Sequence, residues 1–286
     1  MRQCAGVDPR IALPEPFGRS PFRVADAVAA GVGRRRLEGR DLSRPFWGVR
    51  ADADHDDLVK AATTLLRPGD RFSHSTAAAI LGAPLPRLEE GLIHITAGPG
   101  LRMPRARGVI GHEFDDRSVI DVRGLPVSES PEVFVSLGSI LPLRFLVAVG
   151  DYLVLDPRRA EHGRPWATIA QLHLAAQEVG RRGIRSTRSA LEYVRLGVES
   201  TKETELRLEL VMAGLPEPEC GHEVRDRLGR WIGWFDLAWP TFRVLGEYDG
   251  DQHRTSPEQY DRDLRRVDAV REDGWTHLRV RKSGLG

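Results

Sequence analysis

The sequence predicts an α/β protein, because segments of helical periodicity alternate with short apolar segments bounded by turn residues. Two observations favour this class. In the last third of the chain a helix is followed by three strands, a polar helix and a final strand. Near the start, two short helical patterns separated by glycine precede a strand. At 286 residues the chain is long enough for two domains.

The composition is typical of a globular protein, with 41% hydrophobic and 29% charged residues. No apolar run approaches the length of a membrane-spanning helix, and the first 30 residues lack the apolar core of a signal peptide. The two cysteines, Cys4 and Cys220, lie far apart and do not form a metal-binding or disulfide pattern. We therefore expect a cytoplasmic protein that does not associate with membranes.

The first 50 residues are basic. They carry 10 arginines and 5 acidic residues, a net charge of +5. Such a charge favours a polyanion such as DNA as a partner, although a solvated surface would have the same composition. The helical patterns at 21–31 and 32–39 and the strand pattern at 46–50 follow the order of a small winged helix. The candidate DNA contacts are Arg34, Arg35 and Arg36.

The middle of the chain combines helices and strands and contains no catalytic pattern. Helices are expected at 58–66, 75–81, 131–141 and 143–155, and strands at 92–97, 108–114 and 119–123. His94 and His112 lie in two of these strands, where they could form a metal pair or be hydrogen-bonded sheet histidines. After a break at 156–165, helices are expected at 167–179 and 186–196.

The last region predicts a helix, a three-stranded meander, a helix and a strand. The segments are 200–213, 220–225, 231–239, 242–249, 257–272 and 275–280. Ser200 and Glu203 have the spacing of a capping box at the start of the first helix. We thus expect four regions: a winged-helix-like head at 1–50, an α/β middle region at 51–160, a helical linker at 161–199 and a C-terminal α/β domain at 200–286.

Acidic residues cluster where the second and third of these strands meet. Asp236 interrupts an apolar strand, and Glu247 lies on the next strand of the predicted hairpin. Asp249 follows two residues later, so its side chain points to the same side as that of Glu247. A buried lone carboxylate is costly, and a Mg²⁺ ion among carboxylates removes that cost. The pattern predicts a site for Mg²⁺ or Mn²⁺, with arginines or solvent as the alternative neutralising partners.

The region from Ser200 to Val280 resembles the PD-(D/E)XK nuclease superfamily, and more closely its branch related to very-short-patch-repair (Vsr-like) endonucleases. The matching segments are 203–207, 214–216, 235–237, 247–253, 263–266, 274–275 and 278–280. The resemblance implies a restriction-endonuclease-like core and a Mg²⁺-dependent DNA endonuclease. It implies that Asp236 and Glu247 bind the metal, with Glu203 reaching the site from the helix and His253 aiding proton transfer.

Other acids and arginines complete the predicted site. Asp249 stands where the superfamily usually has a lysine, so it would assist the two metal ligands, and His253 or a second metal would position the attacking water. Arg265 and Arg266, on the following helix, could contact phosphate or face solvent.

A second hypothesis is a DNA-binding regulator with an inactive nuclease domain. The missing lysine and the end of the chain soon after the last predicted strand favour it. Residues 20–50 and 72–137 also resemble the antitoxin of abortive-infection (AbiEi-type) toxin–antitoxin pairs, through Ser73-His-Ser-Thr-Ala-Ala and Gly124-Leu-Pro-Val. That resemblance implies DNA binding and a toxin or another protein as partner. The sequence does not indicate an oligomeric state.

Overall fold

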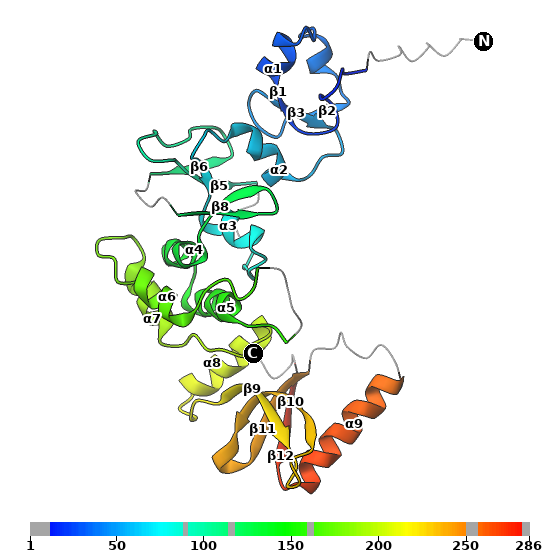
Figure 1. Ribbon diagram of the computed structural model, residues 1–286, viewed down its shortest axis with the longest axis vertical. Helices are drawn as coiled ribbons and strands as arrows, with labels where there is room; N and C mark the ends of the chain where they lie inside the picture. The colour runs from blue at the N-terminus through cyan, green and yellow to red at the C-terminus, as the bar shows by residue number, and fades with distance from the viewer. Residues whose placement is uncertain (1–11, 88–90, 114–117, 159–162, 250–256, 282–286) are drawn as a thin grey trace, which may run out of the picture. The chain divides into compact units, whose positions relative to one another are not determined.

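The computed structural model describes residues 12–87, 91–113, 118–158, 163–249 and 257–281 (Figure 1). The protein is mixed α/β and forms two compact units. Unit 1 comprises residues 1–77 and 87–128, and unit 2 comprises residues 78–86 and 129–286. The division near residue 128 runs through the expected middle region and joins its two long helices to the C-terminal part of the chain.

The head of unit 1 is a small antiparallel sheet with strand order β1–β3–β2. Its elements are β1 (Phe22–Arg23), α1 (Val24–Ala29), the 3₁₀ turn η1 (Arg36–Glu38), β2 (Leu42–Ser43) and β3 (Val49–Asp52). The second helix expected at 32–39 is only the turn η1. Leu37 is the one fully buried side chain of this segment. Packing therefore adds little to a longer helix, and short helices need such packing to form.

The rest of unit 1 is a five-stranded mixed sheet in the order β6–β5–β4–β8–β7. Its elements are α2 (Leu58–Ala62), η2 (Thr63–Leu65), β4 (Arg71–Phe72), α3 (His74–Ile80), β5 (Ile93–Thr96), β6 (Val109–His112), β7 (Val119–Val122) and β8 (Leu125–Ser128). The sequence patterns did not predict β4 and β8. A two-residue strand has no periodicity, and Pro126 weakens the strand pattern of β8.

Unit 2 begins with a helical layer. Its helices are α4 (Ser130–Leu137), α5 (Leu143–Val154), α6 (Ile169–Ala175) and α7 (Ile184–Leu191). Phe134, Leu146 and Leu172 are fully buried among them. α5 packs against both α7 and α8 (Thr201–Met212), so the helical layer is continuous with the start of the C-terminal region. Among the described helices none is long and apolar enough to cross a membrane.

The C-terminal part of unit 2 is a four-stranded sheet in the order β12–β11–β10–β9. After α8 come β9 (Glu219–Arg225), β10 (Trp231–Trp239), η3 (Pro240–Phe242), β11 (Val244–Asp249), α9 (Pro257–Glu272) and β12 (Thr276–Arg281). β9, β10 and β11 pair antiparallel, and β12 joins β11 in parallel. Figure 1 shows α9 running alongside this sheet, where it packs against β10 and β12. The expected order of helix, three-stranded meander, helix and strand is confirmed.

Candidate functional site

Asp236 and Glu247 face each other across the β10–β11 hairpin. The strand register pairs Leu237 with Gly246, and its next step sets Asp236 opposite Glu247. Directly opposed residues of an antiparallel pair point to the same face of the sheet. The backbone N–H of Tyr248 donates a hydrogen bond to Asp236 Oδ2 over 2.8 Å. The hairpin expected from the sequence therefore brings the two predicted metal ligands together.

Asp236 is a largely buried acid that feels the charge of two other carboxylates. Burial, and then the negative charge of Glu203, raise the pKa of Asp236 to about 7. The hydrogen bond from Tyr248 opposes this effect, while Glu247 adds to it. Burial and the neighbouring carboxylates therefore both disfavour the charged form of Asp236, and a proton or another cation at this carboxyl would relieve that cost.

Glu247 is held by two positive or hydrogen-bonding partners. Arg266 Nη2, from α9, donates to Glu247 Oε1 over 2.7 Å. His277 Nε2, from β12, lies 2.6 Å from Glu247 Oε2, and the His277 side chain is 3% exposed. Burial pushes the pKa of Glu247 up, but the bonds from His277 and Arg266 outweigh it and hold that pKa below its usual value.

Arg266 is built into this site by three contacts. Besides Glu247, it donates to the Trp234 carbonyl oxygen, and its guanidinium lies 4.6 Å from the centre of the Phe235 ring. The sequence analysis left two alternatives for Arg266, a phosphate contact or an arginine that faces solvent. Its neighbour Arg265 is exposed on α9 and donates to the carbonyl of Asp261. Of these two arginines, Arg265 is the one exposed to solvent.

Glu203 caps its own helix. Its Oε2 accepts the Glu199 N–H over 2.8 Å, and its Oε1 accepts the Ser200 hydroxyl over 2.8 Å. Ser200 Oγ in turn accepts the Glu203 N–H over 3.2 Å. Ser200 is thus the N-cap of α8, but the predicted capping box is only half formed, because the Glu203 carboxylate accepts the N–H of Glu199 and not that of Ser200. Burial raises the pKa of Glu203, and its charge acts on Asp236 even though both of its oxygens are engaged in the cap.

The other predicted acid and the predicted proton-transfer group lie at the end of β11. Asp249 Oδ2 is 3.8 Å from Arg279 Nη1 and 3.8 Å from Arg281 Nε, both on β12. Asp249 is thus within ion-pair distance of two arginines. His253 lies outside the described residues.

The predicted DNA contacts of the head divide into two kinds. Arg34 and Arg35 are exposed just before η1. Arg36 forms an ion pair with Asp41, with 2.7 Å between Nη2 and Oδ2, and its side chain is 18% exposed. Arg34 and Arg35 are therefore available to a partner, whereas Arg36 also holds the head together.

Two proteins of Mycobacterium tuberculosis are similar to this chain. They are the uncharacterized protein Rv2248 of strain ATCC 25618 / H37Rv and the uncharacterized protein MT2308 of strain CDC 1551 / Oshkosh. Each is 35% identical over 244 residues, which cover 84% of this chain and 86% of the relative. This chain belongs to their family. The aligned region covers most of both chains and therefore includes parts of both compact units.

Other comparisons add little to this assignment. No family model matches the sequence. The crystal structure of the Rv2827c protein from Mycobacterium tuberculosis aligns with 72% of this chain and 83% of that chain, at 18% identity and a TM-score of 0.40.

A buried ion pair anchors α8, the helix that carries Glu203. Arg207 Nη2 donates to Asp151 Oδ2 over 2.9 Å, and the two side chains are 0% and 1% exposed. Asp151 also accepts the Thr204 hydroxyl and the Arg195 N–H. Since Asp151 lies on α5, this network joins the helical layer to the candidate site and explains why unit 2 begins before the expected boundary at residue 200.

Sequence reasoning missed His277 as a site residue. Alternation along 275–280 puts His277 on the same side of its strand as Arg279, but the parallel register that aligns Arg279 with Glu247 is seen only in the structure. It also missed His74, which lies beside His94 and His112 in unit 1. These three imidazoles are the one group of three metal-ligating side chains that converges closely among the described residues.

Proposed function

We propose that the C-terminal part of unit 2 is a metal-dependent DNA endonuclease with a restriction-endonuclease-like core. The observation that carries this proposal is that Asp236 and Glu247 lie on adjacent strands of the β10–β11 hairpin, each one residue beyond the Leu237–Gly246 pair, with Asp236 bound by the Tyr248 N–H. The order of α8, the three antiparallel strands, α9 and the parallel strand β12 supports it, as does the resemblance of residues 200–280 to Vsr-like nucleases.

The donor set fits Mg²⁺ or Mn²⁺. Both ions prefer carboxylate oxygens, and Asp236 and Glu247 would supply them. Burial first, and then the charges of Glu203 and Glu247, raise the pKa of Asp236, and a cation bound there would favour its charged form. Each carboxylate oxygen has two lone-pair sites, so Glu247 can keep Arg266 and His277 and still serve as a ligand.

The residues of the chain would then have distinct roles. A bound divalent ion supplies charge neutralisation at the phosphate and lowers the pKa of a bound water. Asp236 and Glu247 hold the ion, while Arg266 and His277 orient the Glu247 carboxylate. The negative charge of Glu203 strengthens cation binding from the helix, and Asp249 assists. Arg265 contacts the DNA backbone, and His253 transfers a proton.

Plasmid cleavage tests the proposal directly. Supercoiled DNA is incubated with the full chain and either Mg²⁺ or Mn²⁺, and nicked product is quantified for the wild type, Asp236→Asn and Glu247→Gln. Asp268→Asn is the matched control, because Asp268 is an exposed aspartate of α9. We expect nicking by the wild type and the control, and its loss in both site variants. Equal cleavage by Asp236→Asn and the wild type would overturn the metal-site assignment.

A second candidate function is a non-catalytic DNA-binding regulator. The observation that favours it is that Glu247 already has Arg266 and His277 as partners and that Asp249 lies between Arg279 and Arg281. The exposed Arg34 and Arg35 of the basic head would then contact DNA, and a toxin or another protein would be the partner. Duplex binding that survives EDTA, with no nicking at any metal concentration, would support this candidate over the nuclease.

A further inference from the structure

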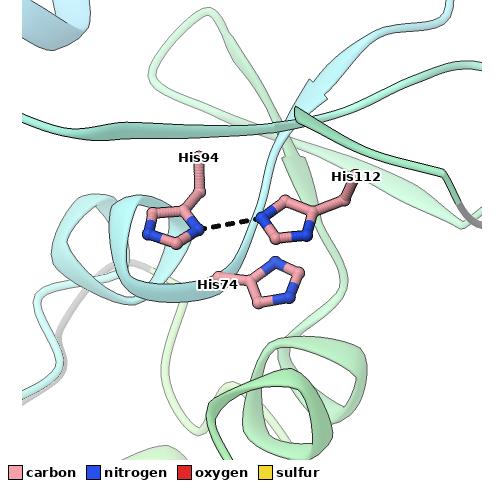
Figure 2. Close-up of side chains that lie close together, drawn as sticks. All are labelled: His74, His94 and His112. Atoms are coloured by element: carbon pink, nitrogen blue, oxygen red, sulfur yellow. Dashed lines mark hydrogen bonds between the residues drawn. The ribbon is translucent and has the colours of Figure 1, made fainter. Parts of the chain in front are cut away.

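Three histidines from separate elements meet in unit 1. His74 is the first residue of α3, His94 lies on β5 and His112 lies on β6. One ring nitrogen from each lies within 4.8 Å of the other two. Figure 2 shows the rings of His94 and His112 side by side, with the ring of His74 next to them. The cluster belongs to the opposite compact unit from Asp236 and Glu247 and is independent of the proposed nuclease site.

The topology of the five-stranded sheet creates this convergence. β5 and β6 are parallel, and the register aligns His94 with Ile110 and Thr96 with His112. Residues two apart on a strand share a face, so His94 and His112 are diagonal neighbours on one face of the sheet. The Ser73 N–H donates to the His94 carbonyl, which sets the start of α3, and with it His74, beside β5.

The rings are closely packed. His94 Nδ1 and His112 Nε2 are 2.9 Å apart and share a hydrogen bond (Figure 2). The rings of His74 and His112 stack with centroids 3.6 Å apart and planes inclined by 15°. His94 is only 8% exposed. Two nitrogens on one tetrahedral metal ion would be about 3.3 Å apart, given metal–nitrogen distances near 2.0 Å. His94 and His112 are thus close to this spacing, and a ring nitrogen of His74 lies within 4.8 Å of both. A metal ion would replace the proton that His94 and His112 share.

Two further features concern the orientation of His74. Its backbone is left-handed, with φ of 50°, a conformation that is strained for a residue other than glycine. Ser73 Oγ lies 3.0 Å from His74 Nδ1. A hydroxyl that accepts the Nδ1 proton directs the ring lone pair to Nε2, as outer partners do for histidine ligands of metals. The strained backbone at His74 thus places a third imidazole beside those of His94 and His112.

The donor chemistry selects a class of ion. Three neutral nitrogens and no carboxylate favour Zn²⁺, Co²⁺, Ni²⁺ or Cu²⁺ over Mg²⁺, which prefers oxygen. We infer that His74, His94 and His112 form a binding site for one divalent transition-metal ion. Zn²⁺ is the ion that this site is expected to bind. Three protein ligands leave a fourth position for water or a partner group. The bound ion would link the start of α3 to β5 and β6 and so stabilise unit 1.

Calorimetry on the full chain tests this inference. Metal-stripped protein is titrated with ZnCl₂, and the visible absorption of added Co²⁺ reports tetrahedral nitrogen ligation. The wild type is compared with His74→Gly, His112→Gln and the control His173→Ala. His74→Gly removes one ligand at a backbone conformation that suits glycine, so this variant keeps its fold. His173 is an exposed histidine of α6.

We expect one Zn²⁺ per chain in the wild type and in His173→Ala, with affinity at least about tenfold weaker in His74→Gly and His112→Gln. Zn²⁺ should also raise the thermal unfolding midpoint of the wild type and not that of His74→Gly. Zn²⁺ binding should persist in Asp236→Asn and in excess Mg²⁺, which separates this site from the carboxylate site. No binding by the wild type, or equal binding by His74→Gly, would overturn the inference.

Discussion

The Tyr248 backbone donates its N–H to Asp236 Oδ2 over 2.8 Å, so the Asp236 carboxylate is fixed across the hairpin from Glu247. This bond holds an acid in a position where burial and the charge of Glu203 raise its pKa to about 7. In the unfolded chain an aspartate has a pKa near 3.9. The folded state therefore binds this proton more tightly than the unfolded state does.

The stability of unit 2 should consequently depend on the charge of Asp236. Since the folded-state pKa is raised, stability falls as pH increases from about 4 to 7, and the full cost is present above pH 7. Asp236→Asn should raise the free energy of unfolding at pH 8 by about 1 to 4 kcal/mol, and by less at pH 5. Urea unfolding at both pH values measures this. A variant no more stable than the wild type at pH 8 would contradict the raised pKa of Asp236.

Arg266 should matter far more than its neighbour Arg265. Arg266→Met leaves Glu247 with His277 alone and the Trp234 carbonyl without this donor, which should cost about 1–3 kcal/mol of stability. Arg265→Met, at an exposed position of the same helix, should change stability by less than about 0.5 kcal/mol. Chemical denaturation of the two variants side by side tests this, and equal losses would mean that the Arg266 contacts contribute nothing.

The buried pair of Asp151 and Arg207 should be the most sensitive electrostatic contact of unit 2. Asp151→Ala leaves a fully buried guanidinium without its main partner and should cost about 3–5 kcal/mol. Glu217→Ala removes a partly exposed partner of Arg207 and should cost about 1 kcal/mol. The double variant Asp151→Leu with Arg207→Met removes both charges and should recover much of the loss. Unfolding midpoints of the three variants give the comparison, and a double variant as unstable as Asp151→Ala would refute this account.

DNA binding by the head should depend on exposed arginines. Replacing Arg34 and Arg35 by alanine should weaken duplex binding and reduce the slope of log affinity against log salt by about 2, one for each lost phosphate contact. Arg36→Ala should mainly lower the stability of the head, because Arg36 is paired with Asp41. Fluorescence anisotropy at several salt concentrations separates the two effects. An unchanged slope in the Arg34 and Arg35 variant would place DNA contacts elsewhere.

The sequence alone determined the elements of the C-terminal region and one of its local contacts. The helix at 257–272 has the bounds of α9, the strand at 231–239 has those of β10, and Ser200 is the predicted N-cap, accepting the Glu203 N–H. These features depend on neighbours within a few residues, where periodicity, turn residues and cap spacing carry the information. The shorter strands β4 and β8 lacked such a signal.

Tertiary structure alone decided which polar groups meet. The sequence brought Asp236 to Glu247 through a hairpin, but Arg266 and His277 reach Glu247 through the packing of α9 and the parallel pairing of β12. Likewise, His74 joins two strand histidines because α3 directly follows β4, and the antiparallel pairing of β4 with β5 places the start of α3 beside His94. Such contacts join residues 19 or more positions apart along the chain. They depend on strand register and helix packing, which local periodicity does not specify.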